Sequence, residues 1–173
     1  MEQNSSKQPN IDTVRAVNSF TDEELHQIIE MEHELFPVGL QDFSYEKEIP
    51  KGNVAVVAYC PEGKVAGYVF AVPHHEAHAQ FRSVDPLMPE AMDAHYIQSI
   101  AIRRDLQGRG YFGKLMKKFL EETNGRAITM HARVSNNCSV GMQKHGATHV
   151  HSVENWFDSG EKFDYLIIEK LSE

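Results

Sequence analysis

The sequence predicts an α/β fold, and two patterns carry this prediction. The stretch 96–102 is rich in β-branched residues, which favour a strand: Ile97, Ile100 and Ile102. Beyond it, large apolar residues recur at the spacing of one helical face: Phe112, Leu115, Met116, Phe119 and Leu120. The period changes at Gly108, so this part of the chain is predicted to form a strand, a tight loop and a helix.

Length and composition suit one globular domain. The chain has 173 residues, of which 41% are hydrophobic and 24% charged, an ordinary balance for a folded protein. We expect residues 1–10, which are polar, to form a disordered tail, and residues 11–173 to form the domain. The net charge of -8 argues against a nucleic-acid partner, because phosphate contacts need clustered Lys and Arg. It fits a cationic substrate.

Cysteine usage and hydropathy indicate a cytoplasmic protein. Cys60 and Cys138 cannot make a disulfide framework, and both are expected to be structural. No apolar run follows the polar tail to form a signal peptide or a membrane span. We therefore expect no membrane association.

The elements before the central strand follow from capping and turn signals. Residues 11–17 alternate as a first strand, and Thr21 to Glu24 form a capping box that opens a helix ended by Phe36-Pro37. A second short helix is predicted around 42–49. Strands over 53–60 and 64–72 should form a hairpin around Pro61-Glu62-Gly63.

Residues 73–93 are predicted to be a long loop, with or without a helical turn. Its histidines suggest a metal site, but His75-Glu76-Ala77-His78 is one residue shorter than the His-Glu-x-x-His pattern of zinc proteases. We expect structural or solvated histidines and no metal. After Asn124-Gly125 ends the central helix, strands are predicted over 127–134, 148–157 and 162–171, with a turn at 158–160.

The loop at Gly108 and Gly110 is a predicted anion site. The glycines flank Arg109 where the helix must begin, so bare backbone N–H groups and the positive helix end favour a phosphate. The spacing to Gly113 also matches a dinucleotide-binding loop. That alternative is not favoured, because the loop lies past the middle of the chain and Glu121-Glu122 falls on the helix.

These residues resemble the GCN5-related N-acetyltransferase (GNAT) family, in which an acetyl-CoA loop follows Gln/Arg-x-x-Gly-x-Gly/Ala. The chain departs from it at Phe112, with Gly113 one place late. The resemblance implies a single mixed, mostly antiparallel central sheet with helices on both faces. It also implies that acetyl-CoA is held by Ile100, Ala101, Ile102, Gln107, Gly108, Arg109, Gly110, Tyr111, Phe112, Gly113, Asn136 and Ser139.

The run from Met130 to Asn136 is similar to that of the ribosomal-protein alanine N-acetyltransferases, in which a glutamate is the general base. His131 takes that place, and a neutral imidazole with a pKa of about 6.5 suits the task. A buried structural histidine remains the alternative. Gln98 is expected to share a strand face with Tyr96 and Ile100 and to bind the amine or a water. Met142 or Gln143 occupies the position of the tyrosine that commonly protonates the departing thiolate in the family, so Tyr111, Tyr96 or water could supply that proton.

The function that the resemblance implies is transfer of the acetyl group of acetyl-CoA to a primary amine by direct attack. The amine could belong to a protein N-terminus, a lysine or a small molecule. The alternative is a catalytically weak acyl-CoA-binding sensor or scaffold. The protein would be a monomer or a homodimer, with 73–93 at the acceptor mouth. Glu30, Glu32 and Glu34 could attract an ammonium there, but a solvated acidic helix face is the favoured interpretation.

Overall fold

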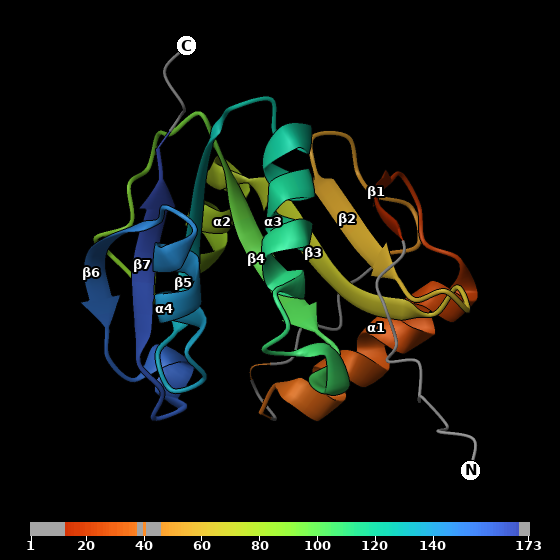
Figure 1. Ribbon diagram of the computed structural model, residues 1–173. Helices are drawn as coiled ribbons and strands as arrows, with labels where there is room; N and C mark the ends of the chain where they lie inside the picture. Colours follow the sequence, from red (N-terminus) through yellow and green to blue (C-terminus); the bar gives the residue numbers. More distant parts are fainter. Residues whose placement is uncertain (1–12, 38–39, 41–45, 170–173) are drawn as a thin grey trace.

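The computed structural model describes residues 13–37, 40 and 46–169. They form one seven-stranded sheet in the order β1-β2-β3-β4-β5-β7-β6, drawn in Figure 1. The strands are β1 (Thr13–Val17), β2 (Val54–Tyr59), β3 (Val65–Pro73), β4 (Ala94–Ile102), β5 (Ala127–Arg133), β6 (Thr148–Val153) and β7 (Phe163–Ile168). The helices are α1 (Asp22–Leu35), α2 (His74–Phe81), α3 (Tyr111–Glu122) and α4 (Cys138–Lys144), with short 3-10 turns η1 (Arg104–Leu106) and η2 (Trp156–Asp158).

The sheet is mixed and mostly antiparallel, as predicted. Only β4 and β5 pair in parallel, and every other neighbouring pair is antiparallel. Helices α3 and α4 pack on one face and α1 and α2 on the other. The prediction of helices on both faces is therefore confirmed.

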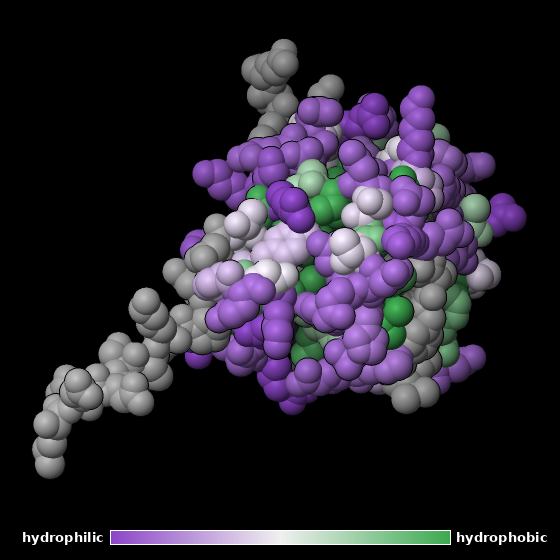
Figure 2. Space-filling model, turned by 90° about the vertical axis from the view of Figure 1, so that its right-hand side faces the viewer, coloured by the Kyte–Doolittle hydropathy of each residue, from purple (hydrophilic) through white to green (hydrophobic). Residues whose placement is uncertain are grey.

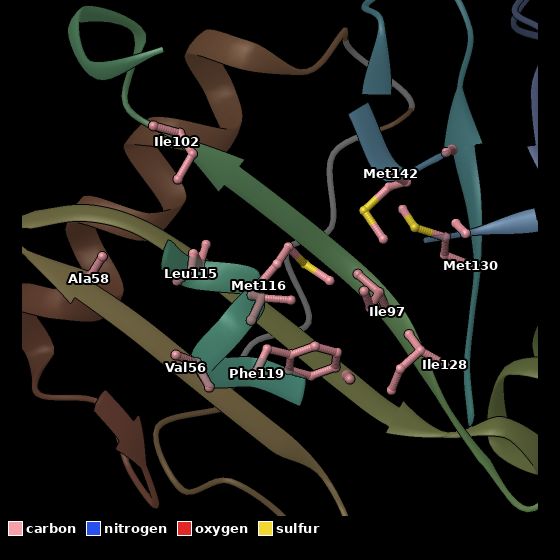
Figure 3. Close-up of a cluster of buried hydrophobic side chains, with 14 of the residues drawn as sticks. Val56, Ala58, Ile97, Ile102, Leu115, Met116, Phe119, Ile128, Met130 and Met142 are labelled. Atoms are coloured by element: carbon pink, nitrogen blue, oxygen red, sulfur yellow. The ribbon is translucent and has the colours of Figure 1, made fainter. Parts of the chain in front are cut away.

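The larger core lies between α3, α4 and the sheet. Leu115, Met116 and Phe119 of α3 are fully buried, and Figure 3 shows them between the helix and the strands. In the same view Met142 of α4 lies beside Met130 of β5. Their burial is the main contribution that holds this layer on the sheet, because buried apolar area dominates folding.

The opposite face has two smaller cores. Ile28 and Met31 of α1 pack on Val57 and Tyr68, and Phe81 of α2 packs on a cluster that includes Trp156 and Tyr165. Figure 2 shows the outer surface on the side of α1 and β1, which is largely hydrophilic with small, separated hydrophobic spots. The predicted capping box is present, since Thr21 and Glu24 bond each other's backbone N–H groups.

The structure corrects three predicted elements. Residues 74–81 form the helix α2 instead of loop, and His74 lies buried with hydrogen bonds to Thr129 and the Pro89 carbonyl. The helix predicted over 42–49 falls partly outside the described residues, and 46–49 contain no helix. The strand predicted over 148–157 ends at Val153, before η2. Among the described helices, none is long and apolar enough to cross a membrane.

Strands β4 and β5 separate soon after they begin. Their pairing is limited to Ala94–Tyr96 against Ala127–Thr129, although both strands continue for several residues, and Figure 1 shows them diverging toward their carboxyl ends. Beyond Tyr96 the two strands are no longer paired with each other. The wedge between the two strands contains the candidate site.

Candidate active site

A cavity of about 820 Å³ occupies the wedge between the carboxyl ends of β4 and β5. Three segments line most of it: the end of β4, the loop before α3, and the start of α4. The described lining residues are Leu35, Phe36, Ile100, Ala101, Ile102, Leu106, Gln107, Gly108, Gly110, Phe112, Arg133, Asn136, Asn137, Cys138, Val140, Gly141 and Lys144.

The glycine loop turns the chain from β4 into α3. Gly108 and Gly110 have φ angles of +73° and +80°, a left-handed conformation that favours glycine. A Cβ built on Gly110 would meet no atom within 4 Å, so it would project into open space. The side chain of Gln107 donates to the Ile102 carbonyl across 2.9 Å, which ties the loop to the strand. The first N–H groups of a helix have no acceptor within the helix, so the start of α3 makes this end of the cavity suited to an anion.

The structure brings together most of the residues predicted to hold acetyl-CoA. Eight of them line the cavity: Ile100, Ala101, Ile102, Gln107, Gly108, Gly110, Phe112 and Asn136. Lys144, at the end of α4, is a lining cation that the sequence did not single out. No local pattern marks it, because it reaches the loop only through tertiary packing.

Four predicted residues are absent from the described lining: Arg109, Tyr111, Gly113 and Ser139. The ring of Tyr111 packs against the larger core, with the Lys114 ammonium 5.2 Å from its centroid. Gly113 gives room to His145, since a Cβ there would lie 3.1 Å from the His145 ring. Ser139 is buried and donates to Asp164 Oδ2 across 2.6 Å, which ties α4 to β7.

A second cavity of about 280 Å³ adjoins the first on the α1 and α2 side. The two share Phe36, Ile100, Arg133, Asn136 and Cys138 as lining residues, so they meet in the wedge. The smaller cavity is lined further by Glu32, Leu40, Gln80, Phe81, Tyr96, Ile97, Gln98, Ser99, Met130, His131, Trp156, Phe157 and Phe163. It is therefore largely aromatic, with several titratable groups.

His131 is at the centre of a buried hydrogen-bond chain. Its Nδ1 lies 2.8 Å from Tyr96 Oη and its Nε2 lies 2.8 Å from Asp85 Oδ2. His151 Nε2 contacts the same Asp85 oxygen at 2.7 Å. An ionised carboxylate only accepts hydrogen bonds, so both Nε2 atoms carry protons and His131 Nδ1 accepts from Tyr96. The phenol hydrogen is thereby directed toward His131.

The surroundings keep His131 neutral and Asp85 ionised. Burial lowers the pKa of His131 to about 4, although the hydrogen bond and charge of Asp85 act in the opposite direction. Burial alone would raise the pKa of Asp85, but hydrogen bonds from His131 and His151 outweigh it and the pKa falls below its ordinary value. Burial raises the pKa of Tyr96 well above its usual range. At neutral pH the chain therefore runs phenol, neutral imidazole, carboxylate.

Glu32 lies in the wall of the smaller cavity, which corrects the favoured prediction of a solvated face for this residue. It is 1% exposed. Its Oε1 accepts hydrogen bonds from Tyr68 Oη at 2.7 Å and Ser99 Oγ at 2.9 Å. The α1 sequence could not reveal this, since Glu30 and Glu34 on the same helix carry exposed side chains paired with His26 and Arg104.

A β-bulge changes the direction of the side chains along β4. Phe70 of β3 pairs with Ser99 of β4, but the next residue, Ala71, pairs with Ile97. Gln98 is therefore the extra residue of the bulge. Tyr96 consequently packs with the α2-side core, whereas Ile100 packs against the α3-side core. The prediction that the two share one face was wrong, because it assumed an unbroken two-residue alternation. Gln98 itself lines the smaller cavity, as its predicted role requires.

The chain matches a protein family model and is similar in fold to several solved structures. The family model described as acetyltransferase (GNAT) family matches residues 23–147. An aminoglycoside 6'-N-acetyltransferase complexed with coenzyme A superposes with a TM-score of 0.69 at 10% identity, over 93% of this chain and 98% of that chain. NAA60 from Arabidopsis thaliana in complex with acetyl-CoA gives a TM-score of 0.61 at 18% identity, over 90% and 96%.

A chimera of the spermidine N-acetyltransferase SpeG from Vibrio cholerae and hSSAT gives a TM-score of 0.64 at 15% identity, over 91% of this chain and 95% of that chain. No curated protein sequence matches this chain. At such low identities the structural likeness establishes the fold alone.

Proposed function

Since this chain belongs to the acetyltransferase (GNAT) family, we propose that it transfers the acetyl group of acetyl-CoA to a primary amine by direct attack. The observation that carries the proposal is the meeting of two cavities in the β4–β5 wedge. One ends at a glycine loop and helix start suited to an anion, and the other contains Tyr96, Gln98 and His131. One cavity can thus hold the donor and the other the acceptor.

The chemistry of the larger cavity suits acetyl-CoA. The open space beyond Gly108 and Gly110 leaves the loop N–H groups accessible to phosphate oxygens, and Lys144 adds a positive charge. The end of β4 at Ile100 to Ile102 lies beyond its pairing with β5 and lines the cavity, so it offers backbone groups to an extended amide chain. When bound, acetyl-CoA supplies an activated acetyl group as a thioester.

We propose that Tyr96 and His131 remove the proton of the incoming ammonium. Because Tyr96 donates its hydrogen to His131 Nδ1, the phenol oxygen can accept a hydrogen from an ammonium or a bridging water in the cavity. A shift of both protons leaves an imidazolium beside Asp85, whose charge stabilises it. Gln98 can hold the amine or the water but cannot act as a base.

Two further residues bear on the mechanism. Cys138 lines both cavities, yet burial raises the pKa of its thiol to about 11 against the opposing charge of Arg133, so it is a poor nucleophile. This supports direct transfer over an acyl-cysteine route.

Tyr111 packs on the larger core instead of the cavity, and a thiol with an ordinary pKa of about 8.5 needs no strong acid near neutral pH.

The test is release of coenzyme A from acetyl-CoA in the presence of single amines. A panel of N-terminal peptides, lysine peptides and small amines should contain at least one that raises thiol release well above the rate without amine. Tight acetyl-CoA binding with no amine-dependent release would instead identify an acyl-CoA-binding sensor or scaffold.

A further inference from the structure

Glu32 brings a negative charge to the wall of the acceptor cavity. Three elements converge on it: α1 supplies the carboxylate, β3 supplies Tyr68 and β4 supplies Ser99. All three side chains are buried. Both hydroxyl groups are neutral donors to Oε1, and their hydrogen bonds orient the carboxylate.

The other walls of this cavity suit an organic cation. Six aromatic side chains line it: Phe36, Phe81, Tyr96, Trp156, Phe157 and Phe163. Aromatic faces attract cations, and they also exclude water, which strengthens the pull of a nearby carboxylate. Trp156 is itself 6% exposed, with its ring 4.4 Å from that of His131.

Charge and size narrow the class of amine. Within the described lining, Glu32 is the only acidic residue, and the cavity volume is about 280 Å³. Arg133 also lines it, but this residue is shared with the larger cavity and its Nη2 contacts the Leu35 carbonyl at 3.4 Å. A compact amine with one positive charge and an apolar body matches these walls better than a polyamine does.

We propose that Glu32 binds the ammonium group of a small, monocationic amine with an apolar body, and thereby selects the acceptor. The inference rests on the proposed function, since it names the substrate class of that same site. Water holds such amines as ammonium ions, so a site must bind the cation before Tyr96 and His131 take its proton. A carboxylate in an aromatic cavity meets that need.

The test uses the full chain with 2-phenylethylamine as the probe and 2-phenylethanol as its neutral counterpart. Trp156 is the only tryptophan of the chain and lines the cavity, so its fluorescence reports occupancy without turnover. Glu32→Gln removes the charge and keeps the shape. We expect it to weaken 2-phenylethylamine binding about 10- to 100-fold and to leave 2-phenylethanol binding unchanged.

Glu30→Gln is the matched control. It removes the same charge from the same helix two positions away, where the side chain is exposed and pairs with His26, and it should leave the affinity for 2-phenylethylamine unchanged. Equal affinity of Glu32→Gln and the parent chain would overturn the proposal. If Glu32→Gln does not fold, the binding of both probes to the parent chain is the test. The proposal is overturned if the parent chain binds 2-phenylethanol as tightly as 2-phenylethylamine, or does not bind 2-phenylethylamine.

The outcomes separate this inference from the proposed function. Glu32-dependent binding of 2-phenylethylamine without release of coenzyme A would support the cation site and contradict the proposed acetyltransferase activity. Acetyl transfer to 2-phenylethylamine, with a KM for this amine that is unchanged in Glu32→Gln, would support the acetyltransferase activity and overturn the role of Glu32.

Discussion

Nε2 of His131 donates a hydrogen bond across 2.8 Å to Oδ2 of Asp85, which lies 46 positions earlier in the chain. Both side chains are 1% exposed, and the same Asp85 oxygen also accepts from His151. The carboxylate therefore decides which nitrogen of His131 carries the proton, and through it the direction of the Tyr96 hydroxyl.

Stability should fall on mild acidification because of His131. Its pKa is about 4 in the folded chain and 6.5 ordinarily, so the unfolded chain binds more protons between these values. The free energy of unfolding should therefore drop as pH falls from 6.5 to 4, on the order of 2 to 3 kcal/mol from this group.

Burial also lowers the pKa of His74 and His95, so the total drop should be larger. Denaturant titrations of the parent and His131→Gln at several pH values would measure the share of His131. A parallel pH dependence in the two proteins would contradict the assignment.

The pH dependence of kcat/KM should carry the same signature. Because the pKa of His131 is about 4, protonation of His131 should lower kcat/KM only on the acid side of the profile. Any rise of kcat/KM between pH 6 and 9 then reflects deprotonation of the amine substrate. His131→Ala should lower the rate about 10²- to 10⁴-fold at neutral pH, with a smaller loss at high pH where free amine is abundant.

Tyr96→Phe removes the hydroxyl that connects the cavity to His131 and should reduce kcat by a similar factor. Tyr165→Phe is the control, because its ring lies 5.0 Å from the His131 ring but is absent from the described lining of both cavities. A loss in Tyr165→Phe as large as that in Tyr96→Phe would indicate general disruption of the cluster instead of a proton route.

Asp85→Asn should inactivate the protein, because it shifts the proton of His131 from Nε2 to Nδ1. Because the Leu87 N–H donates to the other oxygen of Asp85, the amide keeps its oxygen on that side and turns its NH2 group toward the two Nε2 atoms. An NH2 group donates, which favours a proton on Nδ1 of His131 and breaks the bond that Tyr96 donates. We expect kcat to fall about 10²-fold or more, with little change in the KM for acetyl-CoA. His151→Gln leaves the Asp85–His131 bond in place and should retain most of the activity, as steady-state kinetics would show.

Gly110→Val should abolish acetyl-CoA binding measured by titration calorimetry, because a branched side chain would occupy the space open to phosphate oxygens. Gly125→Val is the control: Gly125 also has a positive φ, +71°, with open space around its Cβ, but it follows α3 at the end remote from the loop. It should lose stability and keep its affinity. Unchanged acetyl-CoA affinity in folded Gly110→Val, or binding of NAD in place of acetyl-CoA by the parent, would overturn the loop assignment.

The local signals in the sequence were sufficient for much of the fold. The Thr21–Glu24 capping box, the Pro61–Gly63 turn and the change of period at Gly108 each depend on residues close together in the chain, and each has the predicted element beside it. The resemblance of the same stretch to the GNAT family also predicted Ile100, Gln107 and Gly110 as binding residues, and all three line the larger cavity. Helix α2 was missed because no apolar period extends through His74–Phe81.

Tertiary structure alone decided which groups meet in the wall of the smaller cavity. The bulge at Gln98 reverses the facing of β4, and it is visible only in the register against β3. Asp85 and Glu32 have unremarkable neighbours in sequence, yet their hydrogen-bond partners come from strands that lie 36 to 67 positions away in the chain. Short-range patterns report propensity and capping, which are local energies. The burial of a carboxylate and its hydrogen bonds depend on which distant segments the folded sheet brings together.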